Sequence, residues 1–402
     1  MGQSSKVLPA APSEGRRPKV RLSKPVEQLV NRFEQSARRE LRRLIRTSSR
    51  FADLAESFPG AAYTLAARHT DRQSRQHAAR LVREGAKLKD VALALDLPLW
   101  LRRLPPEAFT GKIGPLPDNE TFARRIATRL PSGRTDPAFW LASVSFAYMA
   151  ADEDFALWLA EQSICSEGAH PERLFSVLAA YAWYSKAPLT SACRLIVVPW
   201  RPEIAFDTAL CAAKSWLNRL RLVMQLEPGK LVDSWLRQGE AMGHQFVPLL
   251  NQEDILEEAQ AMQNCADQYA DRLAREKCRL FSVRRGTIRV ATLEIGPHPR
   301  ETGILAITQL KARHNMPAST EIWQAAHAWL ASQTGLKRLL PVVAQERALN
   351  ARIWDDLIEP YRQSKAGAAW LPSIPTQIAF SRLDSDMTDL ARRAGVTSWL
   401  FT

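Results

Sequence analysis

The sequence predicts a mainly helical protein, in which an N-terminal helical bundle precedes a small α+β module with a three-stranded antiparallel meander flanked by helices. Two observations predict this fold. Apolar residues recur at helical spacing through most of residues 26–250. Three short strand-like runs then follow within residues 279–310. The 402 residues are 46% apolar and 24% charged, so the chain is too hydrophobic to remain unfolded and long enough for two or three domains.

Basic residues concentrate at the N-terminus. Residues 1–50 contain 13 Lys and Arg against 4 Asp and Glu, a net charge of +9, whereas residues 251–335 contain 10 of each. Residues 1–25 combine this charge with Pro, Ser and Gly and lack apolar periodicity, which predicts a disordered basic arm.

An amphipathic helix is expected to follow the arm from Val26 to Ile45, with arginines on its exposed side. Arm and helix together could neutralise several phosphates of DNA or RNA without reading the bases. The alternatives are a solvated basic face, or a contact to an acidic protein or a membrane surface. The candidate phosphate contacts are Arg16, Arg17, Lys19, Arg38, Arg39, Arg42, Arg43 and Arg46.

Residues 50–250 read as helices separated by Pro and Gly, and short loops between such helices favour antiparallel packing. Residues 85–101 resemble the first half of a helix-turn-helix unit, but a Pro-Pro stop stands where a recognition helix would continue. The expected helices cover residues 61–84, 88–101, 121–130, 137–165, 171–185, 207–224 and 229–242.

The α+β module is expected over residues 251–335. A helix over 253–275 precedes strands at 279–284, 287–295 and 304–310, and a second helix covers 320–332. The tail, residues 336–402, mixes helical and extended pieces, and its three tryptophans indicate that it packs against the rest of the protein.

Four segments of this module carry a family resemblance: Met262-Gln-Asn-Cys265-Ala-Asp-Gln-Tyr269, Cys278-Arg-Leu-Phe-Ser-Val-Arg284, Ala291-Thr-Leu-Glu-Ile295 and Gln309-Leu-Lys-Ala-Arg-His-Asn315. In this order they resemble the PcfJ-like family, named after an accessory protein of a bacterial conjugative plasmid. The chain departs from the family pattern at Asn264, where His often precedes the Cys, and at Ala312, where Gly is usual. The resemblance implies a bacterial protein linked to plasmid or other mobile-element DNA and to other proteins of such elements, but no particular reaction.

The same segments supply a candidate site. Cys265, Tyr269 and Arg272 would share one face of the expected helix, and Thr292 and Glu294 alternate onto one face of a strand. One hypothesis is an enzyme in which His314 takes the proton of a Cys265 nucleophile. The alternatives are a buried structural cysteine and a polar pocket for a ligand or partner. The candidate pocket residues are Tyr269, Arg272, Thr292, Glu294, Gln309 and Asn315.

Other classes of function find no support in the sequence. The five cysteines are scattered and form no C-x-x-C pair, so neither a disulfide framework nor a metal site is expected. No P-loop, dinucleotide fingerprint or nucleophile elbow is present, and no cofactor is predicted. No apolar run is long enough for a membrane span, which favours a cytoplasmic protein. Whether the protein is an enzyme or an adaptor between proteins stays open at this point.

Overall fold

The computed structural model describes residues 22–131, 136–226, 232–338, 349–365 and 368–396. The chain divides into two compact units, Met1–Ile113 and Gly114–Thr402. The division falls inside the helical region expected over residues 26–250. Nearly all of the predicted basic arm lies outside the described residues.

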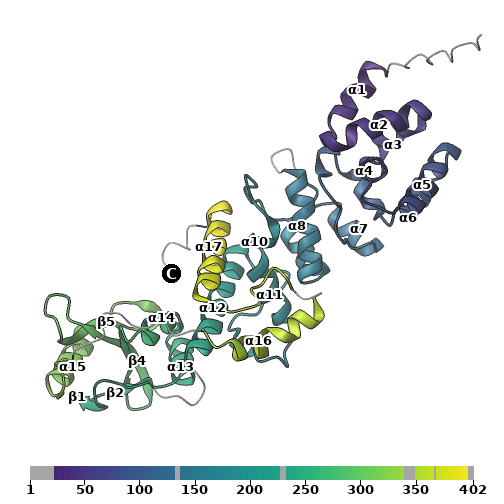
Figure 1. Ribbon diagram of the computed structural model, residues 1–402. Helices are drawn as coiled ribbons and strands as arrows, with labels where there is room; N and C mark the ends of the chain where they lie inside the picture. The colour runs from purple at the N-terminus through teal and green to yellow at the C-terminus, as the bar shows by residue number, and fades with distance from the viewer. Residues whose placement is uncertain (1–21, 132–135, 227–231, 339–348, 366–367, 397–402) are drawn as a thin grey trace, which may run out of the picture. The chain divides into compact units, whose positions relative to one another are not determined.

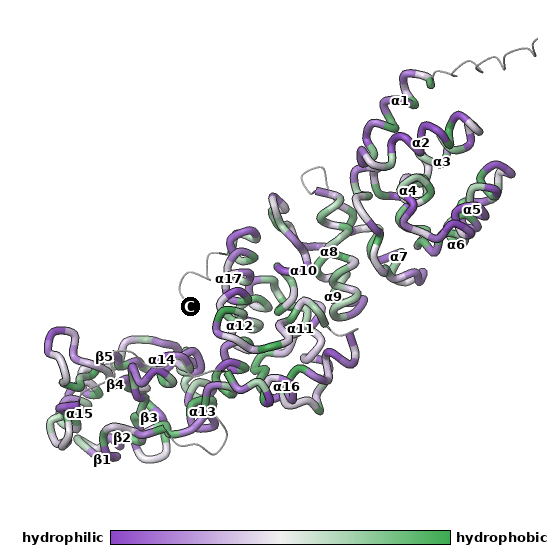
Figure 2. The backbone as a smooth tube through the Cα atoms, in the orientation of Figure 1, coloured by the Kyte–Doolittle hydropathy of each residue, from purple (hydrophilic) through white to green (hydrophobic). Residues whose placement is uncertain are grey.

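The first unit is helical, and apolar residues from all of its longer helices are buried. Its described residues carry 18 Lys and Arg against 10 Asp and Glu. Figure 2 shows that hydrophilic residues dominate along α2 and α5. The helices are α1 (Lys24–Asn31), α2 (Gln35–Thr47), α3 (Arg50–Ser57), α4 (Pro59–Ala67), α5 (Arg72–Glu84) and α6 (Leu88–Ala94).

The single amphipathic helix predicted from Val26 to Ile45 is wrong, because the chain turns between α1 and α2. Glu34 adopts an extended backbone at the break, and Phe33 beside it is buried. The turn lets residues of both helices reach one core. Arg38 Nε donates to the carbonyl oxygen of Phe33 at 2.7 Å, which satisfies an acceptor that the break leaves without a helical partner.

Eight helices of the second unit form its all-helical part, in which the C-terminal helices lie beside α10, α11 and α12 (Figure 1). Tyr184 Oη donates to the carbonyl oxygen of Leu357, and Tyr361 Oη donates to that of Ala150. The tail therefore packs, as its tryptophans indicated. The eight are α7 (Glu120–Ile126), α8 (Pro137–Ala150), α9 (Glu153–Ala160), α10 (Pro171–Leu174), α11 (Ser176–Ser185), α12 (Phe206–Gln225), α16 (Ala351–Ser364) and α17 (Gln377–Arg393).

The rest of the second unit contains a five-stranded antiparallel sheet in the order β1-β2-β3-β4-β5. The predicted three-stranded meander is therefore wrong. The three expected strands are present, and two more precede them. The first of these, Gly239–Ala241, lies where a helix was predicted over 229–242, and the second, His244–Pro248, follows directly after it. Met242 and Gly243 both have positive φ and connect β1 to β2 as a two-residue hairpin turn. The strands are β1 (Gly239–Ala241), β2 (His244–Pro248), β3 (Arg279–Arg285), β4 (Ile288–Pro297) and β5 (Leu305–Lys311).

Helices cover both faces of the sheet (Figure 1). On one face, α15 (Thr320–Ala331) packs Trp329 against Phe246 and Phe281. On the other lie α13 (Gln252–Met262), a 3₁₀ turn (Ala266–Tyr269) and α14 (Ala270–Ala274). The continuous helix predicted over 253–275 is thus wrong. It ends at Met262 because Gln263 takes a left-handed conformation, with φ of 47°.

Candidate functional site

A small pocket of about 20 Å³ lies between the broken helix and the sheet, where β5 forms the sheet edge. Five of the six residues predicted to bind a ligand line it, together with Cys265. Arg272 is not part of the lining but contacts two lining residues, Glu294 and Tyr269. The lining residues are Asn264, Cys265, Ala266, Tyr269, Leu280, Thr292, Glu294, Gln309, Lys311 and Asn315.

The sheet supplies the floor of the pocket through its strand register. Thr292 pairs with Lys311, and Glu294 pairs with Gln309, so these four side chains share the face that α13 and α14 cover. The predicted common face of Thr292, Glu294 and Gln309 is confirmed. An irregularity follows at Glu294 and Ile295, and Thr308 Oγ1 there donates to Glu294 Oε1 at 2.6 Å.

The broken helix supplies the opposite wall. The left-handed Gln263 lets the next residues leave the helix axis, and Asn264 Nδ2 donates to Thr292 Oγ1 at 2.8 Å. The 3₁₀ turn that carries Tyr269 is held to α12 by a buried ion pair, with Arg219 Nε 2.8 Å from Asp267 Oδ2. Tyr269 Oη then donates to Gln309 Oε1 at 2.5 Å.

The third wall is the turn after β5, where two successive residues, His314 and Asn315, have left-handed φ of 59° and 58°. A non-glycine residue in this conformation costs about 1–3 kcal/mol, so it persists only where the surrounding structure holds it. This turn places Asn315 Oδ1 3.6 Å from Cys265 Sγ. His314 is exposed and is not part of the lining.

Burial controls the protonation of the cysteine. Desolvation raises the pKa of Cys265 above its ordinary value of 9.0, and the contact from Asn315 only partly opposes this. The thiol is therefore neutral near pH 7. A thiolate nucleophile needs a lowered pKa and a base in reach, and the sulfur instead faces an amide. The geometry favours a binding role for Cys265.

The negative charge of Glu294 is balanced by Arg272. Its carboxylate is buried and receives both Nη atoms of Arg272, which also lies over the ring of Tyr269 with 5.0 Å from Cζ to the centroid. Behind the pocket, the fully buried Glu258 accepts from Thr292 Oγ1 at 2.7 Å and lies 3.0 Å from Arg289 Nε. Desolvation raises the pKa of Glu258.

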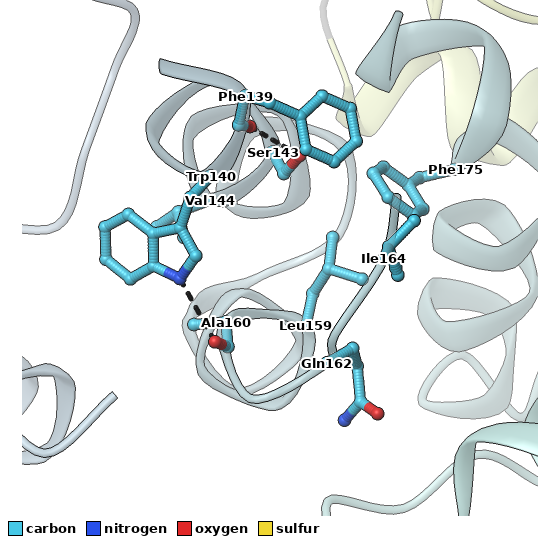
Figure 3. A pocket seen from close by; sticks show the side chains of 9 residues that line it. All are labelled: Phe139, Trp140, Ser143, Val144, Leu159, Ala160, Gln162, Ile164 and Phe175. Atoms are coloured by element: carbon cyan, nitrogen blue, oxygen red, sulfur yellow. Dashed lines mark hydrogen bonds between the residues drawn. The ribbon is translucent and has the colours of Figure 1, made fainter. Parts of the chain in front are cut away.

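A second pocket, of about 10 Å³, lies between α8, α9 and the start of α11 and is lined mainly by apolar side chains (Figure 3). Most of its polar side-chain atoms have partners inside the protein. Trp140 Nε1 donates to the carbonyl oxygen of Ala160, Ser143 Oγ to that of Phe139, and Gln162 Nε2 to that of Trp158. This pocket is therefore mainly a small gap in the apolar packing.

The first unit holds the candidate nucleic-acid contacts. Arg16, Arg17 and Lys19 lie outside the described residues. On α2, Arg42 pairs with Glu27 at 2.7 Å and Arg43 with Glu40 at 2.5 Å, while Arg38 is bonded to backbone as described above. Arg39 and Arg46 are exposed and pair with no other described residue.

Sequence reasoning missed a second group of cations near the α5–α6 turn. The Arg50 guanidinium lies against Gly85, which ends α5 with φ of 79°, and the Arg83 guanidinium lies over the Phe51 ring at 5.5 Å. Exposed Lys87 follows in the same turn. Counting charge as far as residue 113 would have revealed this group, because residues 1–113 contain 23 Lys and Arg against 11 Asp and Glu.

Among the described residues, no group of His, Cys, Asp and Glu is arranged to hold a metal ion. No helix of this part of the chain has the length and apolar character of a membrane span. Comparison with family models, with curated proteins and with solved structures found no match to this chain.

Proposed function

We propose that the protein binds nucleic acid through its N-terminal unit, by contacts to the phosphate backbone of DNA or RNA. One observation carries the proposal: residues 1–113 hold a net charge of +12, out of +13 for the whole chain. Such an uneven distribution is typical of a protein that neutralises phosphates with one region and uses another for a different purpose.

The side chains of the described part agree with this proposal. Arg39, Arg46 and Arg50 are exposed and have no carboxylate partner among the described residues, so their guanidinium groups are available to phosphate oxygens. Of the arginines predicted to contact phosphate, Arg42 and Arg43 pair with carboxylates of the neighbouring helix and of their own helix. Arg43 is exposed, and an exposed ion pair contributes little stability, so this side chain can exchange its partner for phosphate. The resemblance of residues 250–335 to a family of mobile-element proteins agrees with a nucleic-acid ligand.

The test is fluorescence anisotropy of the full-length protein with a labelled mixed-sequence DNA duplex and with the corresponding RNA. The variant Arg39→Gln/Arg46→Gln/Arg50→Gln should weaken binding about tenfold or more at moderate salt, because three phosphate contacts are lost. The matched control Arg237→Gln/Lys277→Gln/Arg300→Gln removes three exposed charges from the second unit. It should bind like the unchanged protein.

Equal weakening by both triple variants would show that net charge alone attracts the nucleic acid, and this result would overturn the assignment to the first unit. Undetectable binding of the unchanged protein to both DNA and RNA would overturn the proposed function itself. A preference for one nucleic acid would leave the proposal standing and identify its ligand.

A further inference from the structure

The first unit contains an open pocket of about 430 Å³ beside α4, the start of α5 and the end of α6. Its lining includes none of the exposed arginines Arg39, Arg46 and Arg50. The volume lies in the range of sites that bind small ligands and is sufficient for one nucleotide. The pocket is therefore large enough to recognise a chemical group other than the phosphates that the arginines attract.

The charges of the lining disfavour an anion. Two carboxylates, Asp71 and Asp96, line the pocket together with one ammonium group, that of Lys112. Asp71 caps α5 and accepts from the backbone N–H of Ser74 at 2.8 Å. Asp96 is exposed and pairs with no other described residue, so water solvates its carboxylate until a ligand replaces that water. The pocket suits a ligand that donates hydrogen bonds to a carboxylate.

The end of α6 fixes the backbone of Asp96 on the pocket wall. The N–H of Asp96 donates to the carbonyl oxygen of Leu93 at 3.2 Å, and that of Leu97 donates to Ala92 at 3.0 Å. Asp96 takes a left-handed conformation there, with φ of 54°, which Asp and Asn adopt more readily than most residues. An Asn at this position therefore keeps the backbone and changes only the carboxylate.

Aromatic rings lead from the core to the pocket. The buried Tyr63 ring lies 6.1 Å from the ring of Phe109 and 6.0 Å from that of His69, between centroids. Tyr63 Oη donates to Glu34 Oε2 at 2.6 Å, which holds its ring in place. His69 lines the pocket and is exposed, so its ring has surface on which another flat ring can stack. Unpaired bases bind proteins in this way.

We infer that this pocket binds one unpaired guanine base of a single-stranded nucleic acid, which donates to Asp96 and stacks on His69. On its Watson–Crick edge, guanine alone among the common bases presents a ring N–H beside an amino group, and this pair matches the two oxygens of a carboxylate. Exposed Lys112 is available to a neighbouring phosphate. The inference rests on the proposed binding of nucleic acid by the first unit and adds a base-specific contact to it.

The experiment measures fluorescence anisotropy of short labelled single strands with the full-length protein. One strand contains thymidine only, a second has a single central guanine, and a third has inosine in its place, so all three carry the same charge. The guanine strand should bind about fivefold or more tighter than the thymidine strand, because a bidentate contact is gained. Inosine lacks the amino group and should lose most of this gain.

Asp96→Asn replaces one acceptor oxygen by an amino group and should reduce the affinity for the guanine strand to that for the thymidine strand. The matched control is Asp90→Asn, which removes an exposed carboxylate from the same helix outside the lining and should keep the preference for guanine. His69→Ala removes the stacking surface and should weaken binding of the guanine strand severalfold. It decides the question if Asp96→Asn does not fold.

Binding of a mixed-sequence duplex separates this inference from the proposed function, since paired bases cannot enter the pocket and Asp96→Asn should bind the duplex like Asp90→Asn. Equal affinity for the guanine and thymidine strands overturns the inference and leaves the proposed function standing. The inference is also overturned if Asp96→Asn keeps the preference for guanine, or if Asp90→Asn loses it equally.

If neither duplex nor single strand binds, the proposed function fails and free nucleotides test the pocket. Guanosine monophosphate should then raise the midpoint of thermal unfolding more than inosine monophosphate does, because a ligand that binds the folded state stabilises it. No rise, or an equal rise with both nucleotides, overturns the inference.

Discussion

Cys265 illustrates how its immediate surroundings decide what a reactive side chain can do. Its sulfur lies against Asn315 in a half-buried position, and the exposed His314 is absent from the pocket lining. Burial favours the neutral thiol over the thiolate. Asn315 can satisfy the S–H group but cannot take up its proton. The residue therefore lines the pocket as a neutral thiol and is poorly suited to nucleophilic attack.

The expected pH profile follows from that environment. The rate of alkylation of Cys265 should rise with pH to a midpoint above its ordinary pKa of 9.0, because burial raises that pKa. Peptide-resolved alkylation across pH 6–11 measures this directly. A midpoint below 7 would show a stabilised thiolate and would restore the hypothesis of a Cys265-dependent enzyme.

At the scale of elements, a break in a helix and an irregularity in the sheet decide where the residues of the candidate site lie. The break at Gln263 turns one predicted helix into α13, a 3₁₀ turn and α14, and the irregularity of the ladder at Glu294 brings Thr308 to the carboxylate. α13 also contributes Glu258, whose buried carboxyl joins the helix to β4 through Thr292. The contact between helix and sheet thus depends on the charge of one carboxyl group.

That dependence predicts a pH effect on stability. Because burial raises the pKa of Glu258 in the folded state, its protonated form is the stable one, fully so below the ordinary value of 4.5. As pH rises through the folded-state pKa, the protein should lose about 1–3 kcal/mol of unfolding free energy relative to Glu258→Gln, which carries no ionisable group there. Urea denaturation of both proteins from pH 5 to pH 8 gives this difference. A constant difference, or a relative gain by the unchanged protein, contradicts the assignment.

Periodicity predicted most elements but not their breaks. The alternation of Thr292 and Glu294, and the expected pairing of β4 with β5, correctly placed Thr292, Glu294 and Gln309 on one face. The breaks at Glu34 and Gln263 carry no Pro or Gly, so nothing local marks them, and the packing of the surrounding core sets the conformation there. The β1–β2 hairpin was missed although Gly243 marks its turn, because the preceding residues fit a helical pattern equally well.

The sequence identified most residues of the candidate site but not the contacts between them. Motif spacing identified Cys265, Tyr269 and Asn315, but it could not show that Asn315 lies against the sulfur, since that depends on left-handed backbone in a turn after β5. Lys311 and Asn264 were not predicted as pocket residues, although Asn264 departs from the family pattern. Both become relevant only once strand register and the end of α13 are known.

For the whole molecule, the distribution of charge is the feature on which the proposed function rests. Residues 1–113 hold +12, and residues 114–402 hold 32 Lys and Arg against 31 Asp and Glu. The second unit is thus nearly neutral overall, so long-range attraction of phosphates is expected from the first unit alone.

The most direct test of nucleic-acid binding by the first unit is the slope of log K against log salt concentration. It is measured for the full-length protein and a mixed-sequence DNA duplex, or RNA if RNA is the ligand that binds. We predict a linear fall in affinity as salt rises, with a slope made shallower by about 2 to 3 in Arg39→Gln/Arg46→Gln/Arg50→Gln, since each phosphate contact contributes roughly 0.7 to 0.9. The control variant in the second unit should keep the original slope. A slope near zero, or the same change in both variants, would contradict phosphate binding by the N-terminal unit.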